Sequence, residues 1–180
     1  MTTMTLDVAS LHSFEYKGVQ LADLVDKIKQ TVEFWGRIGI VKDVDSFGFA
    51  VVLQRELADG VWDDPSEYVS FVGGWGPDEY RYIANAVRKL RAAIRNADDT
   101  LTLLDQEDLL EEGATSFLTP VGSQNEDGSI PWGDFPYGGA AYVNFGEEEL
   151  LVGVSALSQE EDDLVASFIG KLIGKTTRRA

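Results

Sequence analysis

Apolar residues recur at helical spacing in two stretches of the first half of the chain. Spacings of three and four residues put side chains on one face of a helix, so both stretches are predicted to be helices with one buried face. We expect the second helix to begin at Pro77, because proline is favoured at the first helical position. Asp78 and Glu79 would then complement the positive end of the helix dipole. The apolar positions are Leu21, Leu24, Val25, Ile28, Val32 and Trp35 in the first stretch, and Ile83, Val87, Leu90 and Ile94 in the second.

Between the two helices, β-compatible runs predict a first hairpin. Its strands would cover residues 38–44 and 47–54, joined by a turn-forming Asp-Ser pair. Residues 59–76, which end in the sequence GGWG, are expected to form an extended surface loop that holds one short strand at 68–72.

A second hairpin is predicted near the end of the chain. Residues 140–145 and 150–157 are two apolar runs joined by a glycine and three glutamates. Alternation sends Leu150, Val152 and Val154 to one face, and the residues between them are apolar too. A strand that is apolar on both faces belongs inside a sheet rather than at its edge.

The acidic residues after this hairpin have a local structural explanation. Ser158 is a favoured N-cap, and Glu161 three residues later completes a capping box. The acidic residues 160–163 then fill the first turn of a last helix, where negative charge is favourable. Paired catalytic carboxylates or a metal cage are the competing interpretation. A cage needs oxygens that converge from separate elements, so no metal site is predicted.

Composition limits the classes of function. A chain of 180 residues with 44% hydrophobic content can bury one sizeable core, so a single domain over 1–180 is expected. Its parts would include an N-terminal segment at 1–17, an irregular insertion at 98–137 and a basic tail at 175–180. The net charge of −16 works against binding to nucleic acid or an anionic membrane. The absence of cysteine excludes disulfides and thiolate metal sites. Because the sequence shows no signal-peptide pattern and no membrane span, we expect a soluble cytoplasmic protein.

A basic stripe runs against this overall charge. Arg81, Arg88 and Arg95 recur every seven residues, with Lys89 and Arg91 nearby, and are expected on the outer face of the second helix. The stripe is either a solvated surface or a subunit contact that meets the acidic helix start of a neighbouring chain.

Aromatic residues in the turn-rich segment before the second hairpin point to assembly. Trp132 and Phe135 lie beside proline and glycine, where burial in the chain's own core is hard to achieve. Exposed aromatics of this kind are typical interface anchors. We therefore expect a homo-oligomer, a dimer or larger, in which a neighbouring subunit covers Trp132 or Phe135 and places its carboxylates near Arg88 or Arg95.

The order of elements and several motifs resemble the GlcG/HbpS-like superfamily, which includes small proteins labelled haem-degrading-domain proteins. The resemblance rests on the helix that begins PDEYRYIANAVRKLRAAIR, on Gly138 and Gly139 before a strand, on the Val-Gly-Val-Ser run at 152–155, and on the acidic start of the last helix. Ala156 stands where the family usually has a glycine in the closing turn. The resemblance implies an α/β (α+β) fold of profilin or PAS type, a single three-layer domain with a central antiparallel sheet flanked by helices.

The same resemblance implies a homo-oligomer that binds a small molecule, with haem or another tetrapyrrole as the leading ligand and haem degradation as a further activity. Haem iron takes an axial His, Met, Cys or Tyr. The candidate ligands here are His12, Tyr137 and Tyr142. Catalytic residues cannot be assigned, so it stays open whether the chain is an enzyme. The alternative is a non-enzymatic acidic interaction module, of adaptor or immunity type, that binds a basic protein partner.

Overall fold

Four sheet strands and three long helices make up most of the described chain. The computed structural model describes residues 15–16, 19–53, 69–96, 139–145 and 148–178. Along the chain, the elements are β1 (Glu15–Tyr16), β2 (Val19–Gln20), α1 (Leu21–Arg37), β3 (Phe47–Val52), β4 (Phe71–Trp75), α2 (Glu79–Asn96), β5 (Ala140–Phe145), β6 (Glu148–Ser155) and α4 (Gln159–Arg178).

The main sheet is antiparallel throughout, with the strand order β4-β3-β6-β5. The strands β1 and β2 form a separate two-stranded pair just before α1. In the main sheet, β3 and β6 are central, and their register sets Ala50 opposite Gly153. The β5–β6 hairpin sets Ala140 opposite the same glycine. The predicted hairpin is therefore confirmed, with its second strand inside the sheet.

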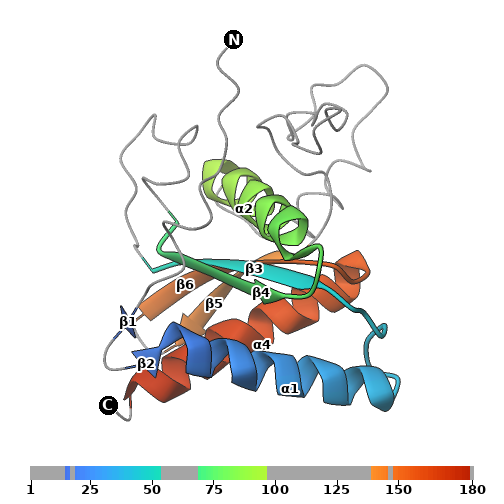
Figure 1. Cartoon of the computed structure of the whole chain (residues 1–180). Coiled ribbons are helices and arrows are strands. Elements are labelled where there is room, and N and C mark those ends of the chain that lie inside the picture. The colour runs from blue at the N-terminus through green and yellow to red at the C-terminus, as the bar shows by residue number, and fades with distance from the viewer. Residues whose placement is uncertain (1–14, 17–18, 54–68, 97–138, 146–147, 179–180) are drawn as a thin grey trace, which may run out of the picture.

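Helices cover both faces of this sheet. Figure 1 shows α2 alone on one face and α1 with α4 on the other. The core is correspondingly divided into two apolar clusters. One lies under α1 and α4 and contains Phe47, Phe49 and Val152, and the other lies under α2 and contains Ala50 and Leu151. The three-layer α+β fold predicted for the chain is confirmed.

The first predicted hairpin is wrong, because residues 38–44 form no strand. The backbone N–H groups of Ile38 and Ile40 instead turn back to the carbonyls of Phe34 and Trp35 at the end of α1. Gly39, with φ at +79°, permits this reversal. Ile38 and Ile40 are about half exposed, so the apolar run that suggested a strand is mostly a surface feature.

The partner of β3 comes from the predicted surface loop. Gly73, Gly74 and Trp75 of the GGWG sequence lie in β4, and Phe47 pairs with Trp75. The two rings stack with centroids 4.5 Å apart. Glycine-rich sequence is a poor strand signal on its own, and here the cross-strand aromatic pair supplies the packing that the glycines lack.

Two glycines let α2 lie directly on the sheet. A Cβ atom placed on Gly153 would come within 2.5 Å of the Ala86 carbonyl oxygen, and one on Gly48 would meet the backbone of Tyr82 and Ile83. Both clashes are with helix backbone, which cannot rotate away as a side chain can. The position of α2 therefore depends on the absence of side chains at these two sites.

We expect Gly153→Ala to lower the free energy of unfolding by about 1–3 kcal/mol, since the added methyl group must push α2 away from the sheet. Urea unfolding followed by circular dichroism measures the change. Gly36→Ala is the matched control, because its Cβ would meet nothing closer than 3.4 Å. Equal stabilities for the two variants would show that the close approach of α2 carries no packing energy.

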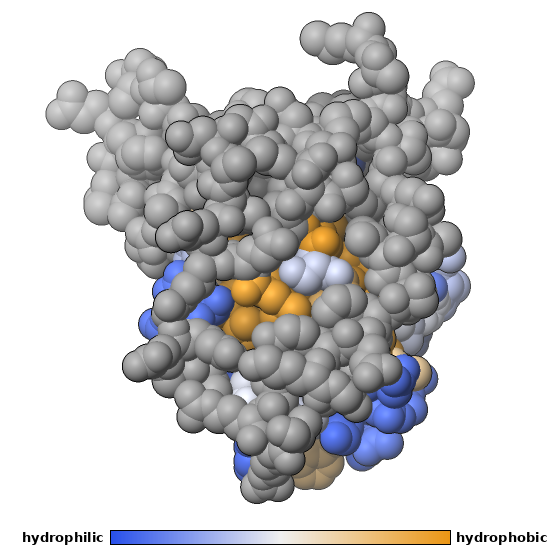
Figure 2. Space-filling view, turned by 90° about the vertical axis from the view of Figure 1, so that its left-hand side faces the viewer, coloured by the Kyte–Doolittle hydropathy of each residue, from blue (hydrophilic) through white to orange (hydrophobic). Residues whose placement is uncertain are grey.

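Some apolar side chains reach the surface. Figure 2 shows an apolar area of the described residues on one side of the molecule. Separately, large apolar side chains that are at least 44% exposed occur at Phe34, Ile38, Ile40, Tyr80 and Leu164. Among the described helices, none is long and apolar enough to cross a membrane.

Candidate functional site

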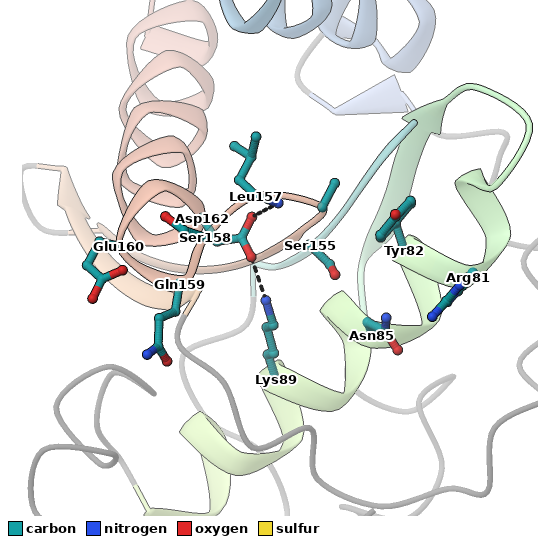
Figure 3. A pocket seen from close by; sticks show the side chains of 11 residues that line it. Arg81, Tyr82, Asn85, Lys89, Ser155, Leu157, Ser158, Gln159, Glu160 and Asp162 are labelled. Carbon is teal, nitrogen blue, oxygen red and sulfur yellow. Dashed lines mark hydrogen bonds and ion pairs between the residues drawn. The ribbon is translucent and has the colours of Figure 1, made fainter. Parts of the chain in front are cut away.

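A pocket of about 490 Å³ lies between α2 and the turn that leads from β6 into α4. Figure 3 shows side chains from α2 on one side of it and the start of α4 on the other. The lining residues are Arg81, Tyr82, Asn85, Lys89, Ser155, Ala156, Leu157, Ser158, Gln159, Glu160 and Asp162. Elements that are far apart in the sequence therefore meet at one cavity.

A buried ion pair stands at the edge of this pocket. The Nζ atom of Lys89 lies 2.8 Å from Oδ2 of Asp162 and donates a second hydrogen bond, 2.7 Å long, to the carbonyl of Val154. The two side chains are only 1% and 3% exposed. Figure 3 shows Lys89 rising from α2 to reach the start of α4. Gly139 makes room for this reach, because a Cβ atom there would lie 2.9 Å from the lysine nitrogen.

Burial opposes the charged form of both partners. Desolvation raises the pKa of Asp162 to about 6, and the nearby Lys89 only partly counters it. Desolvation also lowers the pKa of Lys89, again against the attraction of its partner. Both pKa shifts disfavour the charged form, so the attraction between the two side chains is what keeps each of them charged inside the protein.

The start of α4 combines a capping box with this ion pair. The Ser158 N–H donates to Oε2 of Glu161 at 3.0 Å, and the Glu161 N–H donates to the Ser158 hydroxyl at 3.3 Å. The predicted capping box is therefore confirmed. The expectation that all the acids at 160–163 only charge a helix end is wrong for Asp162. Its Oδ1 accepts the Leu157 N–H at 3.0 Å, while its Oδ2 holds Lys89.

The basic stripe does not lie wholly on the outer face of α2. Arg81 is exposed, but Arg88 is only 2% exposed, and desolvation lowers its pKa to about 10. The side chain of Arg95 lies outside the described residues. Placement on the outer face is thus wrong for Arg88, and a role of the three arginines in a subunit contact stays a prediction. Contact between basic residues of α2 and the acidic helix start does occur, through Lys89, within one chain.

The turn at Ala156 has an unusual backbone. Ala156 has a φ of 138°, a positive value that glycine adopts easily and other residues rarely do. Among the described residues it is the one non-glycine residue with a positive φ. The sequence resemblance placed a glycine at this position. Strained backbone of this kind persists where the surroundings enforce it, often at functional sites. Here the strained residue forms part of the pocket wall.

Of the three predicted haem ligands, the structure describes only Tyr142. His12 and Tyr137 lie outside the described part of the chain, as do Trp132 and Phe135. The Tyr142 hydroxyl donates to the carbonyl of Ala93 at 3.1 Å, a contact that ties β5 to α2. Tyr142 does not line the pocket. Their roles as haem ligands and interface anchors stay predictions.

The polar residues of α2 that line the pocket are spaced by four, whereas the sequence analysis followed arginines spaced by seven. Arg81, Asn85 and Lys89 are four residues apart and so share one side of α2. All three line the pocket, together with Tyr82 from the same helix. A polar stripe at intervals of four, next to the apolar stripe, was the sequence signal that could have found this site.

Comparisons with known proteins relate the chain to others by fold alone. No family model matches it, and no curated protein does. The crystal structure of Ybr137w is similar with a TM-score of 0.54 and 15% identity, covering 95% of this chain and 87% of that one. A double mutant of Streptomyces reticuli HbpS, with a TM-score of 0.43, 17% identity and coverage of 96% and 97%, is too loosely similar to carry an argument. The first similarity shows a shared fold, and membership of the resembled superfamily stays a prediction.

We expect Lys89→Met to cost about 3–5 kcal/mol of unfolding free energy at pH 8, because it leaves the Asp162 carboxylate buried without a counter-charge. Its folded pKa, already raised from 3.8 to about 6, would rise further. A raised folded pKa means that stability is lost as pH increases through the interval between the two values. The deficit relative to the parent should therefore be smaller at pH 5 than at pH 8, measured by urea unfolding at both pH values.

Lys29→Met is the control for this pair. Lys29 and Glu33 form an exposed pair 3.9 Å apart on α1, for which about 0.5 kcal/mol or less is expected at either pH. A Lys89→Met deficit that is equal at pH 5 and pH 8 would contradict titration of Asp162 in this range.

Ala156→Gly should raise the free energy of unfolding by about 1 kcal/mol, because glycine adopts a φ of 138° without strain. Ala84→Gly, in the middle of α2, should lower it by a similar amount, since glycine weakens a helix interior. Chemical denaturation of both variants gives the two signs. Destabilisation by Ala156→Gly would mean that the turn is not strained.

Proposed function

We propose that the chain binds a small organic molecule in the pocket between α2 and the start of α4. The observation that carries the proposal is the strained turn at Ala156 in the pocket wall. A fold keeps such a turn at a cost of about 1–3 kcal/mol when the geometry is needed. The pocket volume of about 490 Å³ lies within the range of about 300–1,000 Å³ of ligand sites in general.

The wall is also held in place from three directions. The ion pair between Lys89 and Asp162 ties α2 to α4, the lysine bond to Val154 ties both to β6, and the Leu157 N–H closes the turn onto Asp162. Binding sites built on regular elements and supported by hydrogen bonds lose less entropy when a ligand arrives. The arrangement therefore favours recognition of one ligand shape over a flexible surface.

Haem or another tetrapyrrole is the ligand that we propose to test first, on the basis of the sequence resemblance. Among the residues that line the pocket, Tyr82 is the one of a type that ligates haem iron. Arg81, exposed at the same pocket, is of the type that pairs with a haem propionate. Bound haem would supply redox chemistry at its iron, and we assign no catalytic step to these residues. Assembly into a homo-oligomer stays a separate prediction.

Titration of the purified full-length chain with haemin tests the proposal. We expect a Soret band that saturates near one haemin per chain, and its position should change in Tyr82→Phe if that phenol binds the iron. Arg81→Trp should weaken binding at least ten-fold by filling the pocket mouth. Gln30→Trp places the same ring on the exposed side of α1, in the opposite layer, and should bind as the parent does.

Two outcomes would overturn the proposal for this pocket. Equal haemin binding by Arg81→Trp and the parent, with loss in His12→Ala or Tyr137→Phe, would move the ligand to the residues predicted from sequence. No binding of haemin, together with no co-purified ligand in native mass spectra, would favour the alternative of an acidic protein-interaction module.

A further inference from the structure

Two buried polar residues line the pocket, one on α2 and one on β6. Asn85, on α2, is 5% exposed, and Ser155, at the end of β6, is 4% exposed. Figure 3 shows Asn85 beside Arg81 on α2, and Ser155 across from Asn85, between Asp162 and Tyr82. Arg81 and Asn85 belong to α2, and Ser155 belongs to β6, on which α2 packs.

The orientation of the Asn85 amide is fixed by its neighbour. Nη1 of Arg88 lies 3.3 Å from Oδ1 of Asn85. A guanidinium can only donate, so the amide must present its oxygen to Arg88 and its NH₂ group elsewhere. Within the described part of the chain, no acceptor takes a hydrogen bond from this NH₂ group. Asn85 therefore has two donors left over at a pocket that it lines.

The Ser155 hydroxyl is in a similar position. The β6 residue pairs with Gly48 through the sheet, so its backbone is committed to the ladder. Its hydroxyl has no hydrogen-bond partner among the described residues, although the residue is nearly buried. Because this hydroxyl lines the pocket, it can donate to a group that enters there.

We propose that Arg81, Asn85 and Ser155 bind a carboxylate group of the ligand. This inference rests on the proposed function and adds the chemical group that the pocket recognises. Three donors that line one pocket, one of them a cation, match an acceptor that carries two oxygens and a negative charge.

The acidic residues of the lining do not oppose this assignment. Asp162 is neutralised by Lys89 and accepts from Leu157. Glu160 is exposed and lies on the other side of the pocket in Figure 3. Since the chain as a whole carries −16, an anion would be attracted here by local donors and not by the overall field.

Benzoate and benzamide make a matched pair of probes, because they share a shape and differ in charge. Titration of the ¹⁵N-labelled full-length chain, followed in amide spectra, should show saturable shifts at Tyr82, Asn85 and residues 155–159 with benzoate. Benzamide should bind at least about ten-fold more weakly, as expected when a charged hydrogen-bond acceptor becomes neutral. Inorganic phosphate in a parallel titration should also bind more weakly than benzoate, since its tetrahedral oxygens do not match a planar pair.

Variants separate the pocket from charge in general. Arg81→Gln and Ser155→Ala should each weaken benzoate about ten-fold. Lys27→Gln removes one positive charge from the exposed side of α1 and should leave binding unchanged. Amide spectra of the free variants that match the parent establish that the fold is kept.

The inference would be overturned if benzamide or phosphate bound as well as benzoate, or if Arg81→Gln and Ser155→Ala bound benzoate like the parent. Haemin binding that is blocked by Arg81→Trp would then leave the pocket as the ligand site and remove only the carboxylate. Absence of binding by haemin and by both aromatic probes would overturn the inference and the proposed function together.

Discussion

The ion pair between Lys89 and Asp162 connects layers that the sheet otherwise keeps apart. Lys89 belongs to α2 on one face, and Asp162 belongs to α4 on the other. The lysine reaches across beside Gly139 and also donates to the carbonyl of Val154 near the end of β6. Buried pairs of this kind add little net stability compared with apolar residues, yet they cost much when one partner is lost. Their value here is geometric, because they fix where two helices and a strand meet.

The pocket is a product of that meeting point. The turn at Ala156 must leave β6 and enter α4 within a few residues while Asp162 stays within reach of Lys89. The capping box of Ser158 and Glu161 fixes the first turn of α4 at the same place. Strain in the turn and burial of charge are thus two costs borne at one site, and apolar packing on both faces of the sheet offsets them.

The sequence predicted what local pattern determines and missed what distant contacts determine. Helical periodicity gave α1 and α2, alternation gave the β5–β6 hairpin, and the capping box gave the start of α4. A short strand was predicted at 68–72, but its extension to Trp75 and its pairing with β3 were missed, because that pairing joins residues twenty or more positions apart. The buried positions of Arg88 and Lys89 were missed because charged side chains on a helix are usually exposed to solvent. For the candidate site, only the acidic helix start was anticipated, and its tie to α2 was assigned to a neighbouring chain.

The bare backbone at Gly48 and Gly153 has a consequence for how this scaffold could change. With α2 seated on the sheet through main-chain contact, substitutions on its pocket side need not alter where the helix lies. The side chains at positions 81, 82 and 85 can therefore be substituted while the position of α2 on the sheet is kept. A protein engineer could vary these three residues as a small library and keep the support below them untouched, so that selectivity is retuned without a new fold.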